Sequence, residues 1–131
     1  MLDKLETFLK QYGWEYKLDA DGKFLTGFTD ENGNGYPLII SSKDELVTLT
    51  TSIELDLEKT QGESQWAVLL LRFNYAWPMV KMGLDDDFRL VLSLDLLSKS
   101  LDYGGFSFSL DVFIETAQML TKEFEEIIKA D

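Results

Sequence analysis

The sequence contains no cysteine and no histidine among its 131 residues. Without cysteine there are no disulfides, no thiolate metal sites and no cysteine nucleophile. Without histidine, the side chain that most often acts as general base or zinc ligand is missing, and so is every Ser-His or Cys-His catalytic pair. A site built from Asp, Glu, Lys or Tyr stays open, but no pair of carboxylates marks a pocket. We therefore expect a protein that is not an enzyme and that uses no cofactor.

Basic residues are also scarce. Twelve Lys and Arg stand against 24 Asp and Glu, which gives a net charge of −12, and the pI is about 4.3. The basic residues are scattered singly and form no stripe. Phosphate backbones and anionic lipid surfaces repel such a chain. Nucleic acid and membrane are therefore not expected as partners.

Long apolar runs are the third absence. No run approaches the roughly 20 residues that a bilayer span requires. Residues 1–13 have acidic side chains inside their apolar pattern, unlike a secretory signal peptide. The hydrophobic fraction of 45% and the charged fraction of 27% are typical of globular chains. We expect one cytoplasmic domain over residues 1–131.

Apolar periodicity predicts the elements of this domain. Helical spacing predicts helices over 2–12, ended by Gly13, over 64–77, ended by Pro78, and from a Ser107 or Ser109 cap onward. Alternation predicts strands over 14–19, 23–28, 36–41, 46–58, 80–84 and 88–96. Pro37 favours an edge position or a strand start for its strand. The order α-ββββ-α-ββ-α predicts an α+β fold, with an antiparallel sheet packed against helices on one face.

Residues 69–96, "LLLRFNYAWPMVKMGLDDDFRLVLSLDL", have a distinctive arrangement. An apolar helix ends in "LRFN" at 71–74, a short strand and an acidic "LDDD" turn at 84–87 follow, and a long amphipathic strand comes last. This arrangement resembles the YbjN-like families of the type III secretion chaperone-like (Tir chaperone-like) fold. The resemblance implies a small acidic dimer that binds proteins, and it supplies no catalytic motif. The chain differs from the usual chaperone in its extra short strand near 36–41.

The stretch "TDENGNGYPLIIS", residues 29–41, has two interpretations. Asp30, Asn32, Asn34 and Gly35 occupy the first, third, fifth and sixth positions of an EF-hand-type calcium loop. The twelfth position is Ser41 instead of the bidentate Glu, and the flanking segments are predicted strands. Repeated Asn-Gly is also what a tight hairpin requires. We favour the hairpin, with a weak calcium site at Asp30, Asn32 and Asn34 as the alternative.

The helix predicted over 64–77 has more apolar surface than a sheet can cover. A stripe of Trp66, Leu70, Phe73 and Trp77 is sufficient for packing on the sheet. This leaves a second group, formed by Val68, Leu71, Arg72 and Tyr75. Monomers rarely keep large exposed apolar patches, so we predict a homodimer through this group, unless another helix of the same chain covers it.

Arg72 itself allows two interpretations. Its stem packs on the core while the guanidinium reaches water, or it is an interface anchor.

The predicted loop "LDYGGFSF", residues 101–108, contains Tyr103 and Phe106 beside two glycines. These aromatic side chains either grip an apolar segment of a partner or fold back to close the core. We include Tyr103 and Phe106 among the candidate protein-interface residues.

The sequence thus predicts a non-enzymatic protein-binding module, chaperone-like or regulatory, that acts as a homodimer with a further protein partner. A small-ligand or weak calcium-binding regulatory domain is the alternative.

Overall fold

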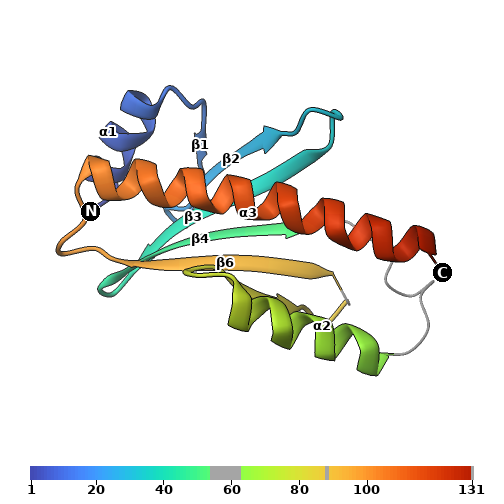
Figure 1. Cartoon of the computed structure of the whole chain (residues 1–131). Coiled ribbons are helices and arrows are strands. Elements are labelled where there is room, and N and C mark those ends of the chain that lie inside the picture. Colours follow the sequence, from blue (N-terminus) through green and yellow to red (C-terminus); the bar gives the residue numbers. More distant parts are fainter. Residues whose placement is uncertain (54–62, 88, 131) are drawn as a thin grey trace.

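The computed structural model describes residues 1–53, 63–87 and 89–130. Within these ranges, helices pack against one six-stranded sheet (Figure 1), as the predicted α+β fold requires. The helices are α1 (Leu2–Tyr12), α2 (Glu63–Ala76) and α3 (Tyr103–Ala130). The strands are β1 (Lys17–Leu18), β2 (Phe24–Thr29), β3 (Gly35–Lys43), β4 (Leu46–Ile53), β5 (Lys81–Leu84) and β6 (Leu90–Leu97). Residues 54–58 of the predicted long strand lie outside the described residues. Among the described residues, no helix has both the length and the apolar composition needed to span a bilayer.

The strand order is β1-β2-β3-β4-β6-β5, and each neighbouring pair is antiparallel. Strand β4 is the centre of this sheet. It pairs with β3 from Leu38↔Thr51 to Lys43↔Leu46, and with β6 along its whole length. Helix α2 and strand β5 lie between β4 and β6 in the sequence, so the chain leaves the sheet and returns through its edge.

Alternation along the strands decides which side chains enter the core. In β4, Val47 and Leu49 are fully buried, whereas Thr48 and Thr50 on the other face are only half-buried. Helix α3 lies across the inner face of the sheet, with α1 and α2 on either side of it (Figure 1). The largest fully buried side chains come from both layers: Phe24, Phe106, Phe113, Phe124, Leu5, Leu9, Leu38, Ile40, Leu49, Leu90, Leu92 and Leu94.

Pro37 lies near the start of β3, as one of the two expectations had it, but β3 is not an edge strand. The ladder from β3 to β4 begins one residue later, at Leu38, so the missing N–H of Pro37 breaks no bond there. The Thr51 hydroxyl instead donates a hydrogen bond to the Pro37 carbonyl. On the other side, Pro37 pairs with Gly27, where an added Cβ would lie 2.8 Å from the Tyr36 carbonyl oxygen. The expected edge position is therefore wrong.

Helix α1 is held against α3. It ends at Gly13, whose φ of 89° is left-handed, as the sequence predicts for a C-terminal cap. The Phe8 ring lies 5.9 Å from that of Tyr103 and 5.5 Å from that of Phe106. The Tyr12 hydroxyl donates to Asp111, and burial, with this hydrogen bond, raises the pKa of Tyr12.

Helix α3 begins earlier than the sequence predicts. Its first residue is Tyr103, and the carboxylate of Asp102 accepts a hydrogen bond from the Gly105 N–H at 2.7 Å. This is the geometry of an N-terminal cap. The expected cap at Ser107 or Ser109 is wrong, because both serines lie inside the helix.

Candidate functional site

One side of α2 is the most exposed apolar surface among the described helices. The side chain of Val68 is 49% exposed, that of Leu71 70% and that of Tyr75 95%. Residues at these spacings lie on the same side of a helix. Met79, which follows the helix, is 48% exposed. We call the set Val68, Leu71, Arg72, Tyr75 and Met79 the α2 outer face.

The opposite side of α2 fixes the direction in which the outer face points. Leu70 is buried, and the Phe73 ring lies 5.5 Å from that of Phe124 on α3. Asn74 joins the helix to β5, because its Nδ2 donates to the Met82 carbonyl at 2.9 Å and its Oδ1 accepts from the Met82 N–H at 2.8 Å. Trp77 is half-buried, while the side chain of Trp66 lies outside the described part.

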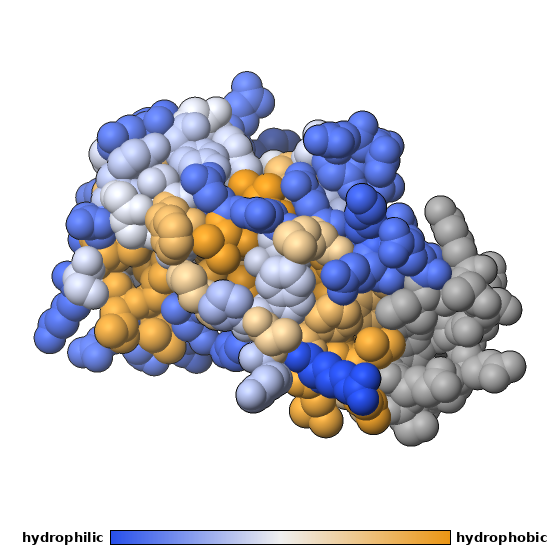
Figure 2. All heavy atoms as spheres, viewed as in Figure 1, coloured by the Kyte–Doolittle hydropathy of each residue, from blue (hydrophilic) through white to orange (hydrophobic). Residues whose placement is uncertain are grey.

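The α2 outer face therefore points away from the sheet. Figure 2 shows apolar side chains gathered over the lower part of the molecule, where α2 lies. Within the described ranges, neither α1 nor α3 covers Leu71 or Tyr75, so the alternative of cover by another helix of the same chain is wrong for these two residues.

Arg72 is exposed on the same face. Among the described residues it forms no ion pair and no hydrogen bond. Its guanidinium thus reaches solvent, which both interpretations of this residue allow. A role as interface anchor stays a prediction.

The structure does not bring Tyr103 and Phe106 to this face. Both lie in the first turns of α3, at the end of that helix that contacts α1. Phe106 is fully buried, so the expectation that it is available to a partner is wrong. Its ring packs on Phe8, and burying it contributes to the core of the same chain. Tyr103 is half-buried against Phe8.

The calcium candidate at 30–35 is the tip of the β2–β3 hairpin, as favoured from the sequence. The Oδ1 atom of Asp30 accepts from the N–H groups of Asn32 and Asn34, both at 2.9 Å. Its Oδ2 accepts from Asn34 Nδ2 at 3.0 Å and from the Tyr36 hydroxyl at 3.1 Å. Burial alone would raise the pKa of Asp30, but these hydrogen bonds outweigh it and lower that pKa. A calcium ion would have to displace donors that already occupy both oxygens. No group of three or more acidic residues suited to a metal occurs in the described ranges.

The other acidic turns repeat this geometry. In the 84–87 turn, Asp85 Oδ1 accepts from the N–H groups of Asp87 and Arg89, both at 2.9 Å, and its Oδ2 pairs with Arg89 Nε at 2.8 Å. The hydrogen bond from the Arg89 backbone is the main reason that the pKa of Asp85 is lowered. In the first turn, Asp19 Oδ1 accepts from the N–H groups of Asp21 and Lys23. The carboxylates of Asp19 and Asp85 thus stabilise tight turns.

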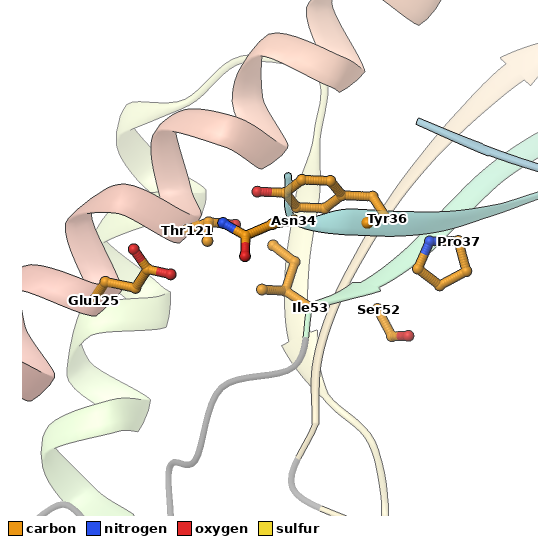
Figure 3. Close-up of a pocket in the computed structure, with 8 residues that line it drawn as sticks. Asn34, Tyr36, Pro37, Ser52, Ile53, Thr121 and Glu125 are labelled. Atoms are coloured by element: carbon orange, nitrogen blue, oxygen red, sulfur yellow. The ribbon is translucent and has the colours of Figure 1, made fainter. Parts of the chain in front are cut away.

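Two hollows flank the contact between the β2–β3 hairpin and α3. One, of about 330 Å³, is lined by Tyr36, Ile53, Thr121 and Glu125 among others. Figure 3 shows the Tyr36 hydroxyl directed toward Thr121 on α3, with Glu125 further along the helix. The second, of about 410 Å³, lies between Glu31 on the hairpin and Lys122 on α3. Neither lining contains a cysteine or histidine, since the chain has none.

Met79 was not predicted to be part of the exposed face. Pro78 predicts the end of the helix, so the residues that follow it were not grouped with the apolar residues of that helix. Met79 has a positive φ of 72° in the connection from α2 to β5, and it is 48% exposed there.

Known proteins resemble this chain in sequence and in fold. A family model described as "YbjN: Putative bacterial sensory transduction regulator" matches residues 1–126. The crystal structure of YbjN from E. coli has a TM-score of 0.77 to this chain at 20% identity, over 96% of this chain and 92% of that chain. No curated protein sequence matches the chain significantly.

Two chaperone structures are also similar. The Yersinia pestis type III secretion chaperone SycH, in complex with a stable fragment of YscM2, has a TM-score of 0.64 at 18% identity, over 90% of this chain and 97% of that chain. The HopA1-SchA chaperone-effector complex has a TM-score of 0.68 at 13% identity, over 92% of this chain and 91% of that chain. At these identities the likeness concerns the fold, and it confirms the predicted chaperone-like arrangement.

Proposed function

The chain belongs to the YbjN family, and on that premise we propose that it is a non-enzymatic protein-binding module, chaperone-like or regulatory, that acts in the cytoplasm as a homodimer. The observation that supports the proposal best is the α2 outer face. Leu71 is 70% exposed and Tyr75 95% exposed on a helix whose other side is fixed to the fold. Exposed apolar patches of this kind on soluble domains are typical of protein-interaction sites.

Charge favours a second copy as the occupant of this face. The chain has a net charge of −12, so two copies repel each other over most of their surfaces. The α2 outer face contains no acidic residue and one cation, Arg72. It is therefore a surface on which two copies approach with little repulsion, and a two-fold axis would place each Leu71 against the partner's copy of α2.

Protein partners other than a second copy are supported by analogy of fold. SycH was crystallised with a fragment of YscM2, and HopA1 and SchA form a chaperone-effector complex. We extend the capacity to bind another protein to this chain, through apolar contacts on its helix faces or on its edge strands β1 and β5.

The test is a Leu71→Asp variant, since a buried charge without a partner would disrupt the proposed interface. Phe108→Asp is the matched control, because Phe108 is 62% exposed on α3, away from the α2 outer face. Light scattering should give wild type and control twice the 15.0 kDa chain mass, and Leu71→Asp the single chain mass. A Leu71→Asp variant that keeps the dimer mass would show that the interface is elsewhere. A monomeric wild type would disprove the homodimer.

The role toward other proteins is tested with the tagged wild type. Tagged wild type should retain one co-purifying protein in near-equal amount from its own cell lysate. Retention of untagged copies of the chain alone would support the dimer and count against a stable protein partner.

A further inference from the structure

Four aromatic rings form a continuous column. Three of them belong to α1, β2 and β3, which lie on the other side of α3 from α2 (Figure 1). Tyr12 lies edge-on to Trp14 with ring centroids 5.4 Å apart, Trp14 stacks on Phe28 at 6.1 Å, and Phe28 stacks on Tyr36 at 4.7 Å. We call these residues the aromatic column. Only Tyr36 is fully buried, while the other three are half-buried. Stacking occupies most of the ring faces, so the exposed remainder is apolar ring edge.

Helix α3 runs alongside the column. At one end the Tyr12 hydroxyl donates to Asp111, and at the other Tyr36 shares a hollow with Thr121. Ten residues of helix span roughly 15 Å, which is comparable to the three centroid separations of 5.4, 6.1 and 4.7 Å taken together. Asp111, Glu115 and Lys122 are exposed on α3 at spacings that place them on one side of the helix.

The border of the column is mostly acidic, with Lys122 on α3 as an exception. Asp111 and Asp30 accept hydrogen bonds from the hydroxyls of the two end rings. Glu115 lies between these ends on α3, and Glu31 adjoins Asp30. In the described part of the chain, neither Glu115 nor Glu31 forms an ion pair. A strip of half-buried rings bordered by the exposed carboxylates of Glu31, Asp111 and Glu115 is complementary to a segment that is both apolar and basic.

We propose that the aromatic column binds a basic amphipathic segment of a partner protein, with apolar side chains on the rings and Arg or Lys beside Asp111 and Glu115. This inference rests on the proposed protein-binding function and names the chemistry of the partner. The net charge of −12 attracts such a segment from a distance, and the carboxylates along the column fix its position. Helix α2 and the elements that carry the column, α1, β2 and β3, lie on different sides of α3 (Figure 1), so the proposed dimer through α2 would leave the column free.

The probes are three synthetic peptides of twelve residues in which leucine alternates with arginine, glutamine or glutamate. Each is labelled and titrated with the full chain by fluorescence anisotropy at physiological salt. We expect the arginine peptide to bind about tenfold more tightly than the glutamine peptide, because several exposed charge pairs add up, and the glutamate peptide not to bind. Equal binding of all three peptides would overturn the proposal.

The position is tested by a matched pair of charge reversals. Glu115→Lys should weaken the arginine peptide about fivefold, whereas Glu45→Lys in the β3–β4 turn makes the same change of charge away from the column and should have an effect under about twofold. Trp14→Leu should also weaken this peptide, because part of the ring surface is lost. Equal effects of Glu115→Lys and Glu45→Lys would mean attraction to net charge alone and would overturn the proposal.

The outcomes separate this inference from the function on which it rests. If the arginine peptide fails to bind a dimeric wild type, the column is not a binding site for basic segments, while the homodimer is still supported. If the wild type is monomeric and the peptide binds with the expected dependence on Glu115, the column is confirmed and the homodimer is disproved.

Discussion

Helices α2 and α3 both contain many apolar side chains, but in different surroundings. On α3, the apolar residues that face the sheet are at most 1% exposed: Phe106, Leu110, Phe113, Ala117, Leu120 and Phe124. On α2, Leu70 is buried while Leu71, the next residue, is 70% exposed. The two helices lie on the same sheet and are in contact through Phe73 and Phe124. Their different exposure of apolar side chains therefore does not result from a different distance to the core.

The difference lies in how many sides of each helix are apolar. On α3, apolar residues repeat at helical spacing and charged residues such as Glu115 and Lys122 occupy the outside. Packing explains this pattern apart from Phe108 and Met119, which are 62% and 39% exposed. On α2, apolar residues continue around most of the circumference, beyond what the contact with the sheet uses. The surplus on α2 is therefore better explained by an interaction than by the fold.

The largest effect that should separate the two helices is the loss of a ring from α3. Phe113→Ala removes a fully buried side chain and should lower the free energy of unfolding by about 3–5 kcal/mol, from lost burial and the cavity left behind. Tyr75→Ala removes a ring that is 95% exposed and should change that free energy by less than about 0.5 kcal/mol. Both are measured by urea unfolding in the Leu71→Asp background, so that dimerisation contributes nothing. Similar losses of unfolding free energy for Phe113→Ala and Tyr75→Ala would contradict the proposed difference between α3 and the exposed side of α2.

A smaller effect should show how α2 is attached. Asn74→Ala removes both hydrogen bonds to the Met82 backbone and should destabilise the chain by about 1–3 kcal/mol, because the Met82 N–H and carbonyl lose their partner. Asn32→Ala, on the hairpin tip, is the control, since only the backbone N–H of Asn32 is bonded. If both variants unfold at the same urea concentration, α2 is attached by apolar contacts alone.

The smallest effect concerns the hairpin beside α3. Millimolar calcium should shift the melting temperature by less than about 1 °C, because ligand binding stabilises only in proportion to the affinity for the native state, and both Asp30 oxygens are already occupied. A rise of several degrees that disappears in Asp30→Asn would instead favour the calcium-binding alternative.

Much of this fold could be predicted from the sequence, because most local conformational preferences of the residues match the structure that tertiary packing requires. The turns at Asp30 and Asp85 were predicted, since an Asp side chain that accepts hydrogen bonds from the backbone two and four residues later favours a turn whatever the strands on either side. The start of α3 was missed because local and tertiary preferences conflict there. Gly104 and Gly105 disfavour a helix, but burial of Phe106 and the Asp102 cap outweigh them.

The candidate surfaces were less predictable. The surplus of apolar residues on α2 predicted the exposure of Leu71 and Tyr75, because it is a property of one helix. The aromatic column joins α1, β2 and β3 with the connection that follows α1, so no single stretch of sequence indicates it. Phe106 was misplaced for the same reason, since its partner Phe8 lies in a different helix.

The docking of α1 on α3 has a consequence for the order in which the protein acquires its structure. The Tyr12 hydroxyl and its acceptor Asp111 are 99 positions apart. Ribosomes add about 5–20 residues per second, so α1 waits roughly 5–20 s after its synthesis before its docking surface exists. During that interval the apolar side chains of Leu5 and Leu9, which are fully buried in the finished protein, have no native surface to pack against. A nascent chain of this kind itself exposes the type of apolar surface that holding chaperones bind.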